Sequence, residues 1–114
     1  MKKQYSIDYY NDDIRQDVDR WPVSLRARYA RLTERMKIYG GNLGEPHTKA
    51  FGNGLFELRV KAEVGIGRAF FCTKVGRKII ILHSFIKKTQ KTPKHDLDIA
   101  LSRMKEKRDE QDSR

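Results

Sequence analysis

Three candidate β-strands follow one another between residues 55 and 86, and short turns containing glycine separate them. They are residues 55–61, 68–75 and 78–86. A parallel connection needs a crossover of roughly a dozen or more residues, which these spacers are too short to provide. The sequence therefore predicts that the three strands pair antiparallel, as successive hairpins.

The side-chain pattern of these strands indicates where each lies in the sheet. In residues 55–61, Phe56, Leu58 and Val60 fall on one face, and the charged residues between them fall on the other. One face is therefore predicted to be core and the other to be charged. Residues 78–86 are almost continuously apolar, which is typical of a central strand covered on both faces.

Two helices are predicted before the strands, after a short N-terminal strand at residues 5–10. Within residues 12–21 the apolar positions lie on one helical face, and Asn11 or Asp12 is placed to cap that helix. Residues 23–39 repeat apolar side chains at spacings of four and three, up to a glycine pair that ends the helix. We expect the two helices to form an antiparallel hairpin on one face of the sheet.

A last helix is predicted after Thr92 and Pro93, with Leu97, Leu101 and Met104 as its apolar stripe. The whole is an α+β fold, with helices on one face of an antiparallel sheet and the other face open to a ligand. We expect one domain over residues 1–104, followed by a charged helix end or tail over residues 105–114.

The charge balance indicates the class of partner. The chain has 25 Lys and Arg against 15 Asp and Glu, a formal net charge of +10, which attracts polyanions such as nucleic acid. No segment is apolar enough to span a bilayer or to act as a signal peptide, so we expect a cytoplasmic protein with no membrane partner. One cysteine and three scattered histidines give no metal-ligand spacing, and no metal or cofactor is predicted.

Several runs of sequence resemble a known family of toxins. They are GLFELRV at 54–60, GRAFFC at 67–72, IILHSFIKKTQKTP at 80–93 and the nearby DIALSRMKE, preceded by EPHTKAF at 45–51. In this order of elements they are similar to the RelE/ParE toxin superfamily and, within it, to phage Gp49-like proteins and HigB-type toxins. The resemblance spans nearly the whole chain.

The resemblance implies a RelE-like fold and the toxin of a type II toxin–antitoxin system. It implies a ribosome-dependent endoribonuclease that cuts mRNA in the ribosomal A site without a metal. It also implies a cognate antitoxin, in the HigB group a HigA-like helix-turn-helix protein. Two alternatives are a ParE-like toxin that poisons DNA gyrase and a phage-derived remnant that binds RNA without cutting it.

RNA can be cut without a metal because its own 2′-hydroxyl attacks the adjacent phosphate. Guanidinium groups suit the charge that develops on the phosphate oxygens. Arg59 lies on the charged face of its strand and Arg68 begins the next strand, so we expect both to stabilise this charge. The resemblance places Arg68 at a catalytic arginine of RelE toxins, and Arg59 matches less closely. The alternative for Arg59 is a simple ion pair with Glu57.

Lysines near the last strand are predicted to hold phosphates. Lys87 and Lys88 match a basic pair of RelE toxins, and Lys87 is a candidate catalytic group. Lys91 and, from the preceding loop, Lys49 are further candidate RNA contacts. The alternative is that lysines here only solvate the end of an apolar strand.

Histidine and phenylalanine complete the candidate site. Histidine is the residue type that ordinarily serves as an acid or base near neutral pH, which makes His83 a candidate, although a buried, hydrogen-bonded histidine has the same pattern. With Glu57 and the two arginines it would form a set that unrelated small ribonucleases use, an analogy of chemistry alone. His47 is a weaker candidate, and Phe85 could stack a base or belong to the core. A tyrosine of RelE toxins is missing from the last helix, so the general acid and base stay open.

Overall fold

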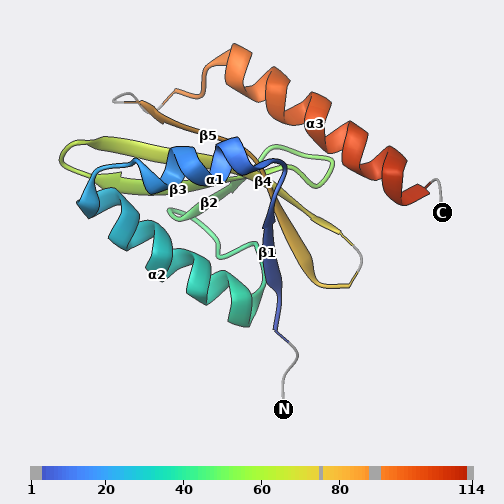
Figure 1. The fold of residues 1–114 in the computed structure, drawn as a ribbon, viewed down its shortest axis with the longest axis horizontal. Coiled ribbons are helices and arrows are strands. Elements are labelled where there is room, and N and C mark those ends of the chain that lie inside the picture. The colour runs from blue at the N-terminus through green and yellow to red at the C-terminus, as the bar shows by residue number, and fades with distance from the viewer. Residues whose placement is uncertain (1–3, 75, 88–90, 113–114) are drawn as a thin grey trace.

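The computed structural model describes residues 4–74, 76–87 and 91–112, and forms a sheet between two layers of helices (Figure 1). None of the helices in these ranges is long and apolar enough to cross a membrane. In chain order the elements are β1 (Ser6–Tyr9), α1 (Asp12–Asp19), α2 (Val23–Tyr39), β2 (Thr48–Ala50), β3 (Phe56–Ala62), β4 (Gly65–Lys74), β5 (Lys78–Lys87) and α3 (Lys94–Asp112).

The five strands form one mixed sheet in the order β1-β5-β4-β3-β2. β3, β4 and β5 pair antiparallel, which confirms the predicted hairpins, and β1 adds to β5 in parallel at one edge. The sequence analysis did not predict β2. This strand has three residues, too few to show an alternating pattern, and it pairs only with the first part of β3, from Phe56 to Leu58.

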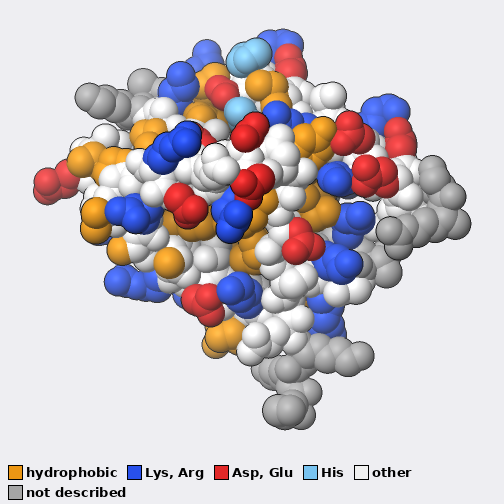
Figure 2. Space-filling model, in the orientation of Figure 1, with side chains coloured by type: hydrophobic (Ala, Val, Ile, Leu, Met, Phe, Trp, Pro, Cys, Tyr) orange, Lys and Arg blue, Asp and Glu red, His pale blue; other side chains and the backbone are white. Residues whose placement is uncertain are grey.

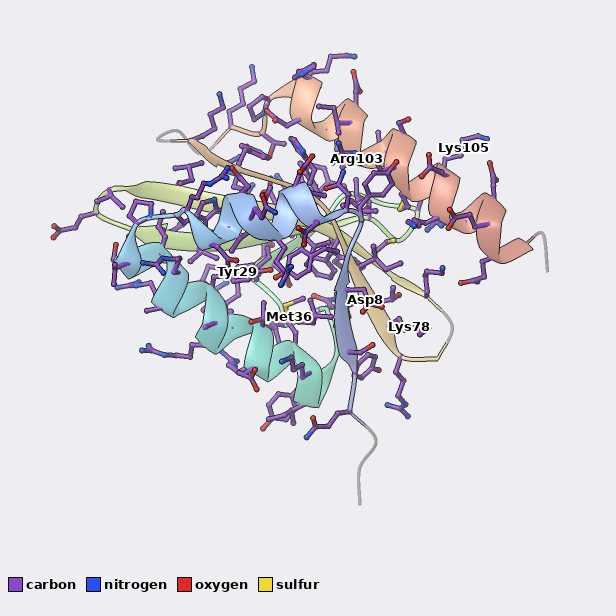
Figure 3. The ribbon with its side chains drawn as sticks, in the orientation of Figure 1. Asp8, Tyr29, Met36, Lys78, Arg103 and Lys105 are labelled. Atoms are coloured by element: carbon purple, nitrogen blue, oxygen red, sulfur yellow. The ribbon has the colours of Figure 1, made fainter. Side chains whose placement is uncertain are left out.

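Helices α1 and α2 cover one face of the sheet, as predicted. Their buried side chains pack on alternate residues of the strands, including Leu58, Val60 and Phe71. Tyr29 and Met36 of α2 point toward the sheet (Figure 3). The Asn11 side chain caps α1 by accepting a hydrogen bond from the Ile14 backbone N–H, as the sequence predicted.

Helix α3 packs on the opposite face, so the expectation of an open second face is wrong for the part that α3 covers. Its buried residues Ala100 and Met104 close a second core over Leu55, Phe70, Cys72, Ile80 and Leu82. The predicted stripe was also partly wrong, because Leu101 is 38% exposed and Ala100 takes its place. The small side chain of Ala100 lets the helix approach the sheet closely, a preference that apolar periodicity does not reveal.

A β-bulge in β5 decides which side chains face α3. Phe70 is paired with His83 and Phe71 with Ile81, so Leu82 is an extra residue in the strand. The alternation shifts by one at this point, and His83 and Phe85 therefore face α3. Arg103 extends from α3 toward the sheet (Figure 3) and donates a hydrogen bond to the Leu82 carbonyl oxygen at 2.7 Å.

Gly67 of β4 lies against the Trp21 ring, and a side chain there should destabilise the fold. An added Cβ would lie 2.5 Å from the nearest ring carbon, closer than two carbons can approach. We expect Gly67→Ala to lower the free energy of unfolding by about 1–3 kcal/mol, measured by urea denaturation. The control is Thr73→Ala at an exposed position of the same strand. Equal stability of the two variants would contradict the packing described.

Cys72 reports how firmly α3 covers the sheet. The thiol is 1% exposed, and burial raises its pKa, so both access and ionisation disfavour its reaction. We expect slow reaction with a thiol reagent in native buffer and fast reaction in urea. Met104→Ala should accelerate the native reaction because it loosens α3, whereas Leu101→Ala, an exposed site on the same helix, should not. Equal acceleration by both variants would contradict the observed helix face.

Candidate active site

The register of the central strands places the two candidate arginines next to each other. Arg59 of β3 is paired with Arg68 of β4, and Arg68 is paired with Phe85 of β5. Residues directly opposite each other share a face, so these three side chains lie on the side of the sheet that α3 faces. Lys49 of β2, which is paired with Glu57, joins them on that face.

Glu57 is the centre of this group. Its side chain is fully buried, and its carboxylate accepts a hydrogen bond from Arg59 Nε at 2.6 Å. The other carboxylate oxygen accepts a hydrogen bond from Thr92 Oγ1 at 3.1 Å and lies 3.7 Å from Arg68 NH1. Thr92 in turn accepts a hydrogen bond from Arg68 NH1 at 3.1 Å. One carboxylate thus holds both arginines and the segment that leads into α3.

The two arginines differ in exposure. The Arg68 side chain is fully buried, whereas 15% of the Arg59 side chain is exposed. Burial lowers the pKa of the Arg68 guanidinium, the Glu57 carboxylate opposes this, and the nearby Arg59 charge adds to the lowering. The Phe85 ring lies 6.0 Å from Arg68 Cζ. Arg59 therefore reaches the surface, whereas Arg68 lies beneath it.

His83 is held by a carboxylate of α3. His83 Nε2 lies 2.7 Å from Asp96 Oδ1, and the two side chains are 17% and 14% exposed. The His83 ring also packs beside Phe85, with ring centroids 5.6 Å apart. A carboxylate on one ring nitrogen orients the imidazole and leaves the other nitrogen for proton transfer, an arrangement that general acid–base catalysis uses.

The remaining predicted residues surround this face at greater distance. Lys87 ends β5 and is exposed, Lys91 is exposed in the segment before α3, and Lys88 lies outside the described residues. Lys49 is exposed, with its Nζ 5.3 Å from the centroid of the Phe51 ring. His47 lies elsewhere, at the edge of the sheet, where its carbonyl oxygen accepts a hydrogen bond from the Arg59 N–H at 2.8 Å.

The His47 side chain belongs instead to a cavity of about 380 Å³ between α2 and β3. Arg59 lies on the wall of this cavity and so connects it to the group around Glu57. The lining residues are Arg28, Arg31, Leu32, Arg35, Pro46, His47, Arg59, Val60 and Lys61. In the part of the chain that the structure describes, no group of three or more His, Cys, Asp or Glu residues is arranged to hold a metal ion.

Three features of the site were missed by the sequence analysis. Thr92 was predicted only as a helix cap, but it bridges Glu57 and Arg68. Asp96 carried no signal, because a carboxylate in the first turn of a helix is ordinary at any helix N-terminus. The sequence analysis assigned no role to the arginines of α2. Each of these contacts depends on how α2 and α3 dock, which local patterns do not specify.

Neutralising Glu57 should destabilise the protein strongly, because it leaves two neighbouring guanidinium groups without their shared carboxylate. We expect Glu57→Gln to lower the free energy of unfolding by about 3–5 kcal/mol, as for other broken buried ion pairs. Glu63→Gln, the same change at an exposed position in the β3–β4 turn, should have little effect. Equal unfolding free energies in urea would show that the carboxylate does not hold this group together.

Comparison with known proteins places the chain in a family. The family described as phage derived protein Gp49-like (DUF891) matches residues 16–105, from α1 into α3. No curated protein matches the sequence. The match covers most of the chain and includes β3, β4, β5 and the segment with Thr92. It confirms the Gp49-like part of the resemblance seen in the sequence, and the chain therefore belongs to the phage-derived Gp49-like family, a toxin-like family.

Proposed function

We propose that this protein is the toxin of a type II toxin–antitoxin system, of the RelE/HigB type, and that it cuts mRNA on the ribosome without a metal ion. A cognate antitoxin, a HigA-like helix-turn-helix protein, would silence it. Membership of the Gp49-like family is compatible with this role.

The observation that best supports a nuclease is the pairing of Arg59 with Arg68 beside an oriented histidine. Arg59 and Arg68 are directly opposite each other, and His83 of the neighbouring strand is on the same face, held by Asp96. Positive charge fixed by a buried carboxylate stays in place as negative charge develops on a phosphate. Phe85 lies between the arginines and the histidine, where a base could stack.

In the proposed reaction, the ribose 2′-oxygen attacks the adjacent phosphorus as the bond from phosphorus to the 5′-oxygen breaks. The products are a 2′,3′-cyclic phosphate and a new 5′-hydroxyl end. Arg59 stabilises charge on the phosphate oxygens, with Lys87 as a second phosphate contact. His83, oriented by Asp96, exchanges the proton of the attacking or the departing oxygen. Arg68 acts through Glu57 and Thr92, which it holds in place.

So few catalytic groups suit a nuclease whose RNA substrate is oriented by another molecule. Holding the RNA in a reactive geometry can replace many catalytic contacts, and the ribosomal A site would provide that geometry. The RNA then needs from the protein only charge stabilisation and proton transfer. Lys49 and Lys91, both exposed beside the face, would add phosphate contacts.

The test is cleavage of mRNA by the purified protein, with and without ribosomes, in a magnesium buffer that keeps ribosomes intact and with a chelator selective for transition-metal ions. We expect cuts on ribosome-bound mRNA that persist in chelator and leave 5′-hydroxyl ends, detected by primer extension and by end-labelling with and without a kinase. Arg59→Ala should lower the rate about 10²–10³-fold, as loss of one charge-stabilising donor does. His83→Gln should lower it about 10²–10⁴-fold.

Arg15→Ala is the matched control for Arg59, because Arg15 is exposed, pairs with Asp12 and belongs to α1, which packs on the opposite face of the sheet. It should cleave as the unchanged protein does. Arg68→Ala is a poor test of chemistry, since a buried partner of Glu57 is lost with it. Intact transcripts together with an SOS response in expressing cells would overturn the nuclease and favour a ParE-like gyrase poison.

A further inference from the structure

We propose that the cavity between α2 and β3 is a second binding site for the RNA backbone, which holds the strand beyond the nucleotide at Arg59. The site rests on the proposed function for its substrate, a single strand of RNA. Nothing in the sequence analysis assigned a role to the arginines that form it.

The cavity is built from one face of α2 and the exposed part of β3. Arg28, Arg31 and Arg35 recur at spacings of three and four, so they line one side of the helix. β2 pairs with β3 only from Phe56 to Leu58, so the later residues of β3 lie at the edge of the sheet. Leu32 and Val60 form an apolar floor between these basic walls.

The positive charge in this cavity is not neutralised from within the chain. None of the lining residues is acidic, and all three α2 arginines are exposed. Among the residues that the structure describes, no carboxylate lies within ion-pair distance of their guanidinium groups. Several exposed basic residues of α1 and α3 differ, with ion pairs such as Arg15 to Asp12 and Lys105 to Asp109.

The surface over α1 and α3 carries charges of both signs. Basic and acidic side chains are interspersed over α1 and α3 on the face that Figure 2 presents. Even next to the cavity, Glu34 of α2 pairs with Lys37 rather than with an arginine of the cavity wall. A cluster of guanidinium groups without counter-charge repels itself, and an anionic ligand relieves that repulsion.

The spacing of these arginines matches a single strand of nucleic acid better than a single small anion. Arg28 and Arg35 are seven residues apart, about 10.5 Å along the helix axis. Phosphates of one strand in a stacked helix advance about 3.4 Å each, so the row spans about three nucleotides. Planar guanidinium groups bind phosphate oxygens in pairs and suit such a row.

Arg59 connects this cavity to the candidate active site. Arg59 is one of the residues that line the cavity, and its side-chain Nε is held by Glu57 at the centre of the group on the sheet. An RNA strand whose reacting phosphate lies at Arg59 would therefore enter the cavity without a break. An acidic protein segment is the alternative occupant of a basic groove, and the continuity of the cavity with Arg59, where the reacting phosphate would lie, favours RNA.

The test is the salt dependence of binding to a fluorescent, single-stranded 2′-O-methyl oligoribonucleotide, which cannot be cut. Each phosphate contact contributes about 0.7 to the slope of log K against log salt for single strands. We expect the triple variant Arg28→Gln, Arg31→Gln, Arg35→Gln to lose about 2 units of slope. The matched control is Arg15→Gln, Lys94→Gln, Lys105→Gln, which removes the same charge from exposed helical sites that are ion-paired. It should lose much less.

Equal losses of slope in the two triple variants would overturn the site, because only overall charge would then matter. The site would also be overturned if the α2 variant weakened binding of a poly-glutamate peptide but kept the RNA slope of the control. Cleavage by the unchanged protein is measured in parallel. If the protein never cuts RNA but the α2 variant shows the specific loss of slope, the binding site stands and the proposed reaction is overturned. If the protein cuts RNA but the α2 variant loses no more slope than the control, the reaction stands and the binding site is overturned.

Discussion

The buried carboxylate of Glu57 is the interaction on which the rest of this surface depends. It lies at the junction of β3, β4 and the segment that leads into α3, and it accepts or attracts groups from each of them. Two guanidinium groups this close repel each other, so neither Arg59 nor Arg68 would stay in place without a shared counter-charge. Burying the carboxylate away from water costs free energy, and the hydrogen-bond donors around it offset that cost. The same group of atoms therefore forms part of the proposed binding surface and stabilises the fold.

Helix α3 is joined to this face by polar as well as apolar contacts. Ala100 and Met104 close the apolar core, whereas Thr92 and Asp96 hold Glu57 and His83. Thr92 and Asp96 lie at the N-terminal end of the helix, and a further polar contact, from Arg103 to the Leu82 carbonyl oxygen, lies midway along it. The same helix therefore stabilises the sheet and orients the side chains that the proposed reaction uses. Loss of its docking would affect both at once.

The charge of the chain is arranged so that two basic surfaces meet at one residue. On the sheet, Arg59 stands beside buried Arg68 and exposed lysines, and at the edge of the sheet it stands beside the arginines of α2. Over α1 and the outer side of α3, basic residues pair with acidic ones. The basic residues of the cavity therefore lie along the edge of β3, where an extended polyanion could follow them from the cavity onto the sheet.

Local patterns in the sequence determined the elements other than β2, the antiparallel pairing of β3 to β5 and the neighbouring positions of Arg59 and Arg68. Alternation fixes which side chains share a face of a strand, and short turns fix which strands are neighbours. Only the tertiary structure decided that α3 covers the second face, that the bulge at Leu82 turns His83 toward Asp96, and that α2 forms a cavity with β3. These features depend on how whole elements pack against one another. Packing brings together residues that are far apart in the chain and that no helical or strand periodicity relates.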